Sequence, residues 1–361
     1  MKRRFLICLS VLIPLVFTVF LLSCEKNYIT QVPEEHVPEY HMTFCYVTDG
    51  IHEPKYIITI NTKTHQVIDS IELTATPYRD MAYIDGGNKA VITNYDHLYI
   101  EDALTHDTLA ITDAIGIDIK ISSDEHYIVS DESKYILSLP DFAIIDSTDT
   151  LRHIGIDGTN KILYAYSYPD SQIYSINFSA TPYETTIVDA TNMRGEPIKL
   201  HYYGYLSPDN ETLLLSYICQ GGYGLVEYDA DSLYVRNEIE CLGLKNAVWT
   251  SDGNICYGTN FDYNVVKYNI ITKIYTIIID QTDIYTGVYK VNVAEELYPI
   301  DIQITPDDKH LYVQIAGRTL FANGHTLVYD LEAKEFIYRY EYSKSLDAWN
   351  FMSLNPKDWS N

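Results

Sequence analysis

A short motif recurs along most of this chain of 361 residues. Its general form is a short apolar strand, a turn of the type Ser/Thr-Pro/Ser-Asp-Gly/Asp, and a Tyr-rich strand, and two of the copies instead share the turn Asp-Gly-x-Asn-Lys. A repeated unit of this kind cannot bury its apolar faces alone, so neighbouring copies must pack together. The repeat therefore predicts one continuous array, although the length alone would suggest roughly two or three domains. The copies lie at Ile84–Lys89, Ile119–Glu125, Ile156–Lys161, Gly204–Asn210, Val248–Asn254 and Ile302–Val313.

The spacing of the copies predicts the architecture. If the turns are aligned at 87, 124, 159, 209, 252 and 307, the intervals are 37, 35, 50, 43 and 55 residues. Periods of about 40 to 50 residues with four short strands each are typical of a β-propeller. In the sixth unit the expected strands are Asn246–Thr250, Asn254–Thr259, Asn264–Asn269 and Lys273–Asp280.

The two ends of the array each lack part of a unit. Met42–Val47, Lys55–Asn61 and Gln66–Leu73 make three strands without an inner one, whereas Trp349–Pro356 resembles an inner strand with its turn and nothing after it. The simplest account is that the C-terminal strand completes the first blade, which leaves no open sheet edge between the ends. The sequence thus predicts an all-β fold, a seven-bladed β-propeller.

The repeat also resembles a known family. Cys256–Asn269, followed by Thr272 and Lys273, is similar to the Tyr-Val-Thr-Asn repeat of YVTN-type seven-bladed propellers, and Cys45–Gly50 is a second copy. Pro299–Val313 resembles the Ser-Pro-Asp-Gly-Lys stretch of that family. The resemblance implies the fold and an extracytoplasmic setting, but no single activity. The Trp-Asp pairing of WD-repeat propellers is missing.

The N-terminal residues resemble a targeting segment. Lys2, Arg3 and Arg4 precede an apolar run that ends in Leu-Leu-Ser-Cys24, which is typical of a secretory signal, with a transmembrane anchor as the alternative. The last four residues resemble the lipobox of bacterial lipoproteins, which implies that Cys24 is diacylated. We expect a signal peptide over 1–23, a lipidated tether over 24–41 and a propeller over 42–361. The expected location is the cell envelope, on the periplasmic or surface side of the outer membrane.

Charge and cysteine content exclude several classes of protein. The formal net charge is −25, from 25 Lys and Arg against 50 Asp and Glu, and it excludes nucleic-acid binding through a basic surface. Without Lys2, Arg3 and Arg4 the balance becomes 22 minus 50, or −28. The four cysteines of the body show no CxxC spacing, so they predict neither a zinc site nor a particular disulfide. They are Cys45, Cys219, Cys241 and Cys256.

Four loops are longer than the rest and share one face of the predicted ring. They span 189–199, 218–223, 280–298 and 316–325, all in blades 4 to 7. Long loops on a rigid scaffold are where binding sites usually lie, although insertions on a stable ring can also be neutral. The candidate binding residues near this face are Arg194, His201, Tyr223, Tyr285, Tyr289, Arg318, Phe321 and Trp349.

A second candidate site lies where the inner strands enter the channel. Counting six residues back from each aligned turn gives a mostly polar ring, which suits Ca²⁺ or Mg²⁺. Asp118 and Asp301 belong to opposite blades, which argues against one shared ion, and polar side chains commonly line propeller channels. The ring consists of Met81, Asp118, His153, Tyr203, Asn246 and Asp301.

Two functions remain open at this point. The first is a membrane-anchored lipoprotein that binds a protein or glycan partner through the long-loop face of blades 4 to 7. The alternative is a lactonase-like hydrolase or lyase with a divalent cation at the channel mouth, because related-looking propellers include such enzymes. The chain contains no Gly-x-Ser-x-Gly, His-Glu-x-x-His, phosphate-loop or dinucleotide motif. No cofactor other than this cation is indicated.

Overall fold

The chain divides into two compact units, Met1–Pro38 and Glu39–Asn361. The structure, a computed structural model, describes residues 37–47, 55–73, 80–94, 96–113, 118–130, 135–147, 151–167, 169–219, 222–240, 242–284, 297–317, 325–341 and 351–360. The predicted signal peptide and Cys24 therefore lie outside the described residues. Within the described ranges, no helix has both the length and the apolar character needed to cross a membrane.

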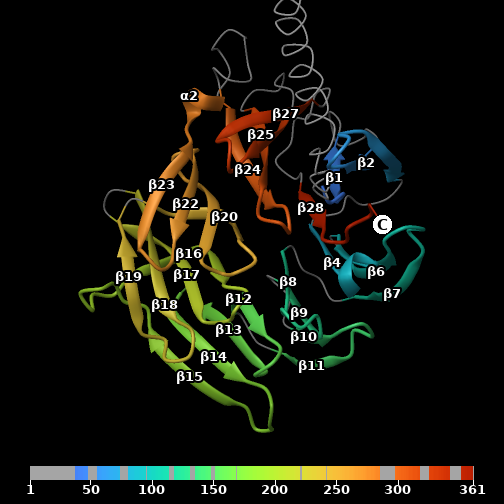
Figure 1. The fold of residues 1–361 in the computed structure, drawn as a ribbon. Helices are drawn as coiled ribbons and strands as arrows, with labels where there is room; N and C mark the ends of the chain where they lie inside the picture. Colours follow the sequence, from blue (N-terminus) through green and yellow to red (C-terminus); the bar gives the residue numbers. More distant parts are fainter. Residues whose placement is uncertain are drawn as a thin grey trace, which may run out of the picture. The chain divides into compact units, whose positions relative to one another are not determined.

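The second unit is built from seven antiparallel sheets of four strands each (Figure 1). Blades 1 and 2 contain β28 (Met352–Asn355), β1 (His41–Val47), β2 (Lys55–Asn61), β3 (Val67–Leu73), β4 (Asp80–Ile84), β5 (Lys89–Thr93), β6 (Leu98–Asp102) and β7 (Thr108–Thr112). Blades 3 and 4 contain β8 (Ile119–Ile121), β9 (Tyr127–Ser130), β10 (Tyr135–Ser138), β11 (Ile144–Ser147), β12 (Arg152–Asp157), β13 (Ile162–Ser167), β14 (Gln172–Asn177) and β15 (Glu184–Asp189).

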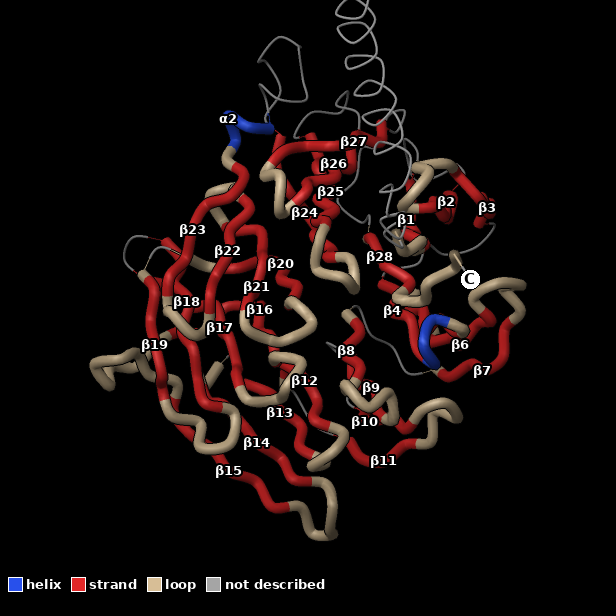
Figure 2. Tube along the Cα trace, viewed as in Figure 1, coloured by secondary structure: helices blue, strands red, loops and turns tan. Residues whose placement is uncertain are grey.

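Blades 5 to 7 follow in chain order. Blades 5 and 6 contain β16 (Lys199–Leu206), β17 (Thr212–Cys219), β18 (Gly222–Asp229), β19 (Val235–Ile239), β20 (Leu244–Trp249), β21 (Ile255–Asn260), β22 (Val265–Asn269) and β23 (Ile274–Ile279). Blade 7 contains β24 (Leu297–Ile304), β25 (His310–Gly317), β26 (His325–Asp330) and β27 (Glu335–Glu341). The described helices are single turns, η1 (Asp85–Gly87) and α2 (Gln281–Asp283), so the regular secondary structure of the described residues is almost entirely strand (Figure 2). The predicted all-β seven-bladed propeller is confirmed.

The C-terminal strand closes the ring as predicted. In blade 1, β28 pairs antiparallel with β1, so that Met352 lies opposite Phe44 and Asn355 lies opposite His41. The side chain of Asn355 also donates a hydrogen bond to the carbonyl of Gly87 in blade 2, at 2.9 Å. Gly87 has a φ of +86° and no room for a Cβ beside Asn355. The last strand thus joins the first two blades.

The turn after the inner strand explains why the repeat is visible in the sequence. In blade 5 the amide of Asn210 donates a hydrogen bond to the carbonyl of Ser207, and the amide of Ser207 donates one to the carbonyl of Thr212. The same pair of hydrogen bonds recurs in blades 3, 6 and 7. The last residue of each turn has a positive φ, the region that Gly and Asn adopt most readily. These residues are Glu125 (57°), Asn210 (62°), Gly253 (69°) and Asp308 (57°).

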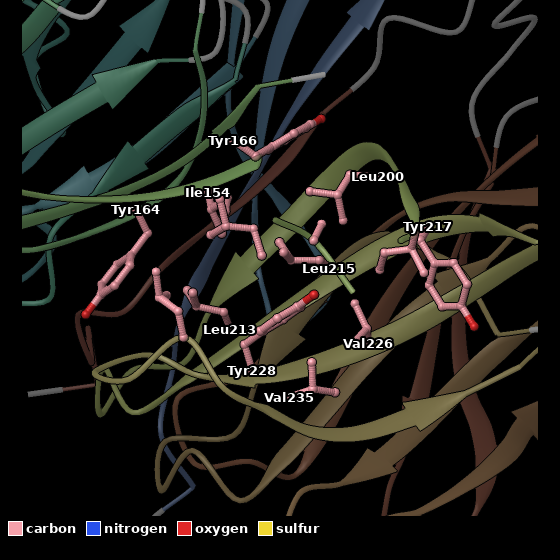
Figure 3. Close-up of a cluster of buried hydrophobic side chains, with 14 of the residues drawn as sticks. Ile154, Tyr164, Tyr166, Leu200, Leu213, Leu215, Tyr217, Val226, Tyr228 and Val235 are labelled. Carbon is pink, nitrogen blue, oxygen red and sulfur yellow. The ribbon is translucent and has the colours of Figure 1, made fainter. Parts of the chain in front are cut away.

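Tyrosine fills the space between the sheets. Figure 3 shows one such cluster, in which Tyr164 and Tyr166 of blade 4 pack against Leu213 and Leu215 of blade 5. Tyr228 is 1% exposed, and its hydroxyl donates to the carbonyl of Thr191 at 2.7 Å. A Tyr ring can therefore be buried while its hydroxyl remains paired. Much of the tyrosine excess has this structural role.

Candidate functional site

A cavity of about 680 Å³ lies at the centre of the ring. Residues of all seven inner strands line it, from β4, β8, β12, β16, β20, β24 and β28. Neighbouring inner strands contact each other in ring order, and β28 contacts β4. The cavity is therefore the central channel of the propeller, and its mouth lies where the inner strands begin, on the face of the long loops.

Irregular strand pairing shapes this mouth in blades 4 to 7. The register between the inner and second strands shifts between His153 and Gly155, and again between Pro299 and Asp301. Blade 6 has the same shift between Leu244 and Asn246. A β-bulge bends a strand and re-aims the side chains beside it, and bulges are common next to functional sites. In blade 5 the shift is wider, between Leu200 and Gly204.

The polar residues predicted for the channel all lie in its wall, and several of them join one blade to the next. The carboxylate of Asp301 accepts the amide of Ile302 and, from blade 1, that of Met352, both at 2.8 Å. The side chain of Asn246 donates to the carbonyl of Ile300 in blade 7. The ring positions therefore contribute to closing the propeller. Asp118, His153, Tyr203, Asn246 and Asp301 all line the cavity.

Asp80 is a ring residue that the sequence analysis missed. Its carboxylate accepts the amide of Met81 at 2.8 Å and that of Ile119 in blade 3 at 2.6 Å. It therefore joins blades 2 and 3 in the way that Asp301 joins blades 7 and 1. The turn in blade 2 is the 3₁₀ turn η1, so aligning it with the other turns placed Met81 in the ring position. The Asp at the first position of β4 could have indicated that Asp80 belongs to the ring.

Burial changes the titration of the two bridging carboxyl groups. Desolvation raises the pKa of Asp80 to about 7 and that of Asp301 to about 7, and the charge of Asp118 adds to both increases. Their backbone hydrogen bonds and the charge of Lys120 act in the opposite direction. Desolvation also lowers the pKa of His153 to about 4. Near neutral pH, His153 is therefore uncharged and the two carboxyl groups are partly protonated.

Carboxylate, imidazole and thiol groups do not cluster in the described part of the channel. Among the residues that the structure describes, no three His, Cys, Asp or Glu side chains converge in a way that could hold a metal ion. Both oxygens of Asp80 and of Asp301 already accept backbone amides. The Ca²⁺ or Mg²⁺ site at the channel mouth therefore stays a prediction.

Aromatic side chains of blades 5 to 7 lie next to one another on the face of the channel mouth, and two of them, Tyr203 and Tyr298, line the cavity. Tyr223 stacks on Phe261 with ring centres 3.7 Å apart, and His201 contacts both rings edge-on, at 4.9 and 5.1 Å. Tyr263 lies 5.4 Å from Tyr298 of blade 7. We call these residues, with Tyr203 beside His201 at 5.7 Å, the aromatic rim. Gly243 allows the stack to form, because a Cβ there would lie 2.5 Å from Tyr223.

Lys245 connects the aromatic rim to the cavity. Its ammonium group lies 5.0 Å from the ring centre of Phe261 and 4.7 Å from that of Tyr263, and the residue also lines the cavity. Desolvation lowers the pKa of Lys245. A cation over aromatic rings is attracted by their negative faces and keeps its remaining donors for a ligand.

The structure brings together two of the eight candidate binding residues, His201 and Tyr223. Arg194 lies at the tip of its loop, 3.8 Å from Glu240, and both side chains are about 70% exposed. The other five are outside the described residues, namely Tyr285, Tyr289, Arg318, Phe321 and Trp349. The prediction based on long loops missed Phe261, Tyr263 and Lys245, which lie outside those loops, and it included the loop that ends at Tyr298 without selecting Tyr298 itself. The turn between β21 and β22 is short, but it lies on the same face as the long loops. Its two aromatic residues, in the sequence Phe-Asp-Tyr, could have indicated a binding surface there.

The buried carboxyl groups predict a pH-dependent stability. Their folded-state pKa values exceed the unfolded value of 3.8, so their contribution is complete below pH 3.8 and is lost as the pH rises through about 7. We expect the free energy of unfolding to fall by about 1 to 2 kcal/mol between pH 6.5 and 8, a range that includes screening of the two carboxylates by water in the cavity. Urea unfolding of the wild type and of Asp80→Asn/Asp301→Asn measures this. The double variant should show a flat profile, and equal slopes would contradict the assignment.

No protein-family model matches this chain, and no curated protein does either. Solved structures do resemble it. The dihydro-heme d1 dehydrogenase NirN in complex with DHE has a TM-score of 0.51 at 10% identity, covering 87% of this chain and 75% of that one. Hsv2 of Kluyveromyces lactis, with loop 6CD replaced by a Gly-Ser linker, has a TM-score of 0.50 at 14% identity, covering 79% and 92%. At such identities the shared property is the β-propeller fold.

Proposed function

We propose that this chain is an exported, lipid-anchored binding protein that captures a glycan at the channel mouth without catalysing a reaction. The observation that carries the proposal is the aromatic rim, which crosses three blades beside a cavity of about 680 Å³. Sugar rings present apolar C–H faces that stack on aromatic side chains, while their hydroxyl groups need polar partners. Tyr and His supply both an apolar body and a polar atom.

The shape of the site favours a glycan over a protein partner. A stable protein interface needs about 800 Å² on each side, whereas small ligands bind in concave sites with a few placed polar groups. The aromatic rim borders such a cavity, and Asn246 and Asp301, which follow the bulges of β20 and β24, line it. The hydrolase or lyase alternative depended on a cation at the ring, and among the described residues no three His, Cys, Asp or Glu side chains converge there to support it.

Replacing one aromatic residue of the rim tests the proposal. Phe261→Ala removes the ring on which Tyr223 stacks and over which Lys245 lies. We expect it to weaken the binding of oligosaccharides about tenfold, because one aromatic contact is worth about 1 kcal/mol or slightly more. The measurement uses the purified full-length chain on an array of immobilised trimers, neutral (glucose, galactose, mannose) and acidic (galacturonate, mannuronate).

The matched control is Tyr234→Ala. Tyr234 is 72% exposed and lies between β18 and β19, at the opposite end of the blade from the aromatic rim. It should bind the array like the wild type. If neither the wild type nor the control bound any trimer, or if the two alanine variants behaved alike, the aromatic rim would not be a glycan site.

A further inference from the structure

Two lysines in the channel form no ion pair within the described part of the chain. Lys120 and Lys245 both line the cavity, and neither forms a salt bridge with a described residue. Each lies over an aromatic ring instead, Lys120 at 5.6 Å from the ring centre of Tyr205 and Lys245 over Phe261 and Tyr263. This is unexpected in a chain with 50 acidic and 25 basic residues. Acidic partners are plentiful elsewhere, where Lys89 pairs with Asp85 at 2.9 Å.

Two carboxyl groups of the same channel are hydrogen-bonded to the backbone of the ring. Both oxygens of Asp80 and both of Asp301 accept backbone amides of the ring. Asp118 faces the cavity beside Lys120, and His153 completes the titratable groups that line it apart from the tyrosines. The channel wall therefore presents two ammonium groups that form no salt bridge with a described residue, although the charge of Asp262 acts on Lys245 and that of Lys120 acts on Asp80 and Asp301. Their hydrogen-bond donors can bind an anion.

The position of Lys245 indicates how such an anion would be held. Lys245 follows the first residue of β20, at the bulge that precedes Asn246. Its carbonyl accepts the hydroxyl of Tyr205 at 2.5 Å, which fixes the backbone, while its side chain lies on the aromatic rim. The ammonium group of Lys245 thus lies over two aromatic rings and in the cavity wall at the same time. A ligand that stacks on the rim would bring its own substituents to this ammonium group.

We propose that the captured glycan is an acidic saccharide whose carboxylate binds Lys245 while its sugar ring stacks on the aromatic rim. This inference rests on the proposed function, because it assigns the ligand class of the same site. Lys120, on β8, provides a second ammonium group for a further carboxylate along the channel. A charge-assisted hydrogen bond to a carboxylate is about twice as strong as a neutral one, so the acidic ligand should be preferred.

The experiment measures the ratio of affinities for matched trimers, galacturonate against galactose, with the full-length chain. We expect the wild type to prefer galacturonate by about tenfold or more, and Lys245→Gln to lower that ratio about tenfold. Lys245→Arg keeps the charge and should preserve most of the preference. Acidification from pH 8 to 6 should tighten galacturonate binding, because Asp80 and Asp301 lose negative charge in the channel.

The outcomes separate this inference from the proposed function. Equal binding of the two trimers, lost in Phe261→Ala, would keep the glycan site and overturn the acidic ligand. A preference for galacturonate that survives in Lys245→Gln would overturn the assignment of the carboxylate to Lys245. If the chain bound none of the trimers, both the proposed function and this inference would be contradicted.

Discussion

Deleting the last strand, by ending the chain after residue 350, should abolish cooperative folding of the propeller. The deletion removes Phe351 and Met352, which are 6% and 2% exposed, and their burial contributes about 1.5 to 3 kcal/mol each. It also removes the amide partner of Asp301 and the partner strand of β1. A domain has a net stability of about 5 to 15 kcal/mol, so losses of this size approach its total free energy of unfolding. Circular dichroism during heating should show no cooperative transition.

A shorter deletion provides the control. Ending the chain after Lys357 keeps β28 and the hydrogen bond from Asn355 to Gly87. It removes the contacts of Asp358 with Glu39 and of Trp359 with His41. This variant should unfold cooperatively at a lower temperature than the wild type. If the longer deletion melted in the same way, closure by β28 would not hold the ring together.

Replacing Cys24 by Ser should abolish acylation of the chain. The lipobox resemblance proposes that Cys24 becomes the first residue of the mature protein and carries the acyl chains. Two or more chains hold a protein durably in a bilayer, because each buried CH₂ contributes about 0.8 kcal/mol. We expect the wild type to incorporate labelled palmitate and to begin at Cys24 by mass spectrometry. Cys24→Ser should lose the label and retain residues 1–23.

Cys8→Ser is the matched control for this experiment. Cys8 lies in the apolar run that processing removes, so the variant should keep both the label and the new N-terminus. A wild-type chain that is unlabelled and still begins before residue 24 would favour the transmembrane-anchor alternative and contradict the lipoprotein proposal.

The fold was predictable because its main signal is local. Ser207, Asn210 and Thr212 form their hydrogen bonds within a single turn, and the same pattern returns in later blades. A local constraint of this kind remains visible in a single sequence. The closing strand was also predictable, since an inner strand without its blade and a blade without its inner strand complement each other.

The candidate site was predictable only in part. Because the inner strands stand in similar register relative to their turns, the alignment of the repeats correctly predicted Asp118, Asn246 and Asp301 in the channel wall. Asp80 was missed because its blade uses a different turn, which moved the alignment by one residue. The contacts of Phe261 depend on the distance between blades 5 and 6, and no pattern within one strand encodes that distance. The position of Lys245 over Phe261 and Tyr263 likewise depends on tertiary neighbours.

Hydrogen exchange with a bound oligosaccharide tests the central claim most directly. The full-length chain would be measured alone and with saturating galacturonate trimer. The account predicts that slowed exchange concentrates in 244–247 and 260–264, the backbone beneath Lys245 and the aromatic rim, and does not extend to the turns at 207–210 and 305–308 on the other face. Slowed exchange confined to those turns, or no change at any segment, would contradict ligand capture at the channel mouth.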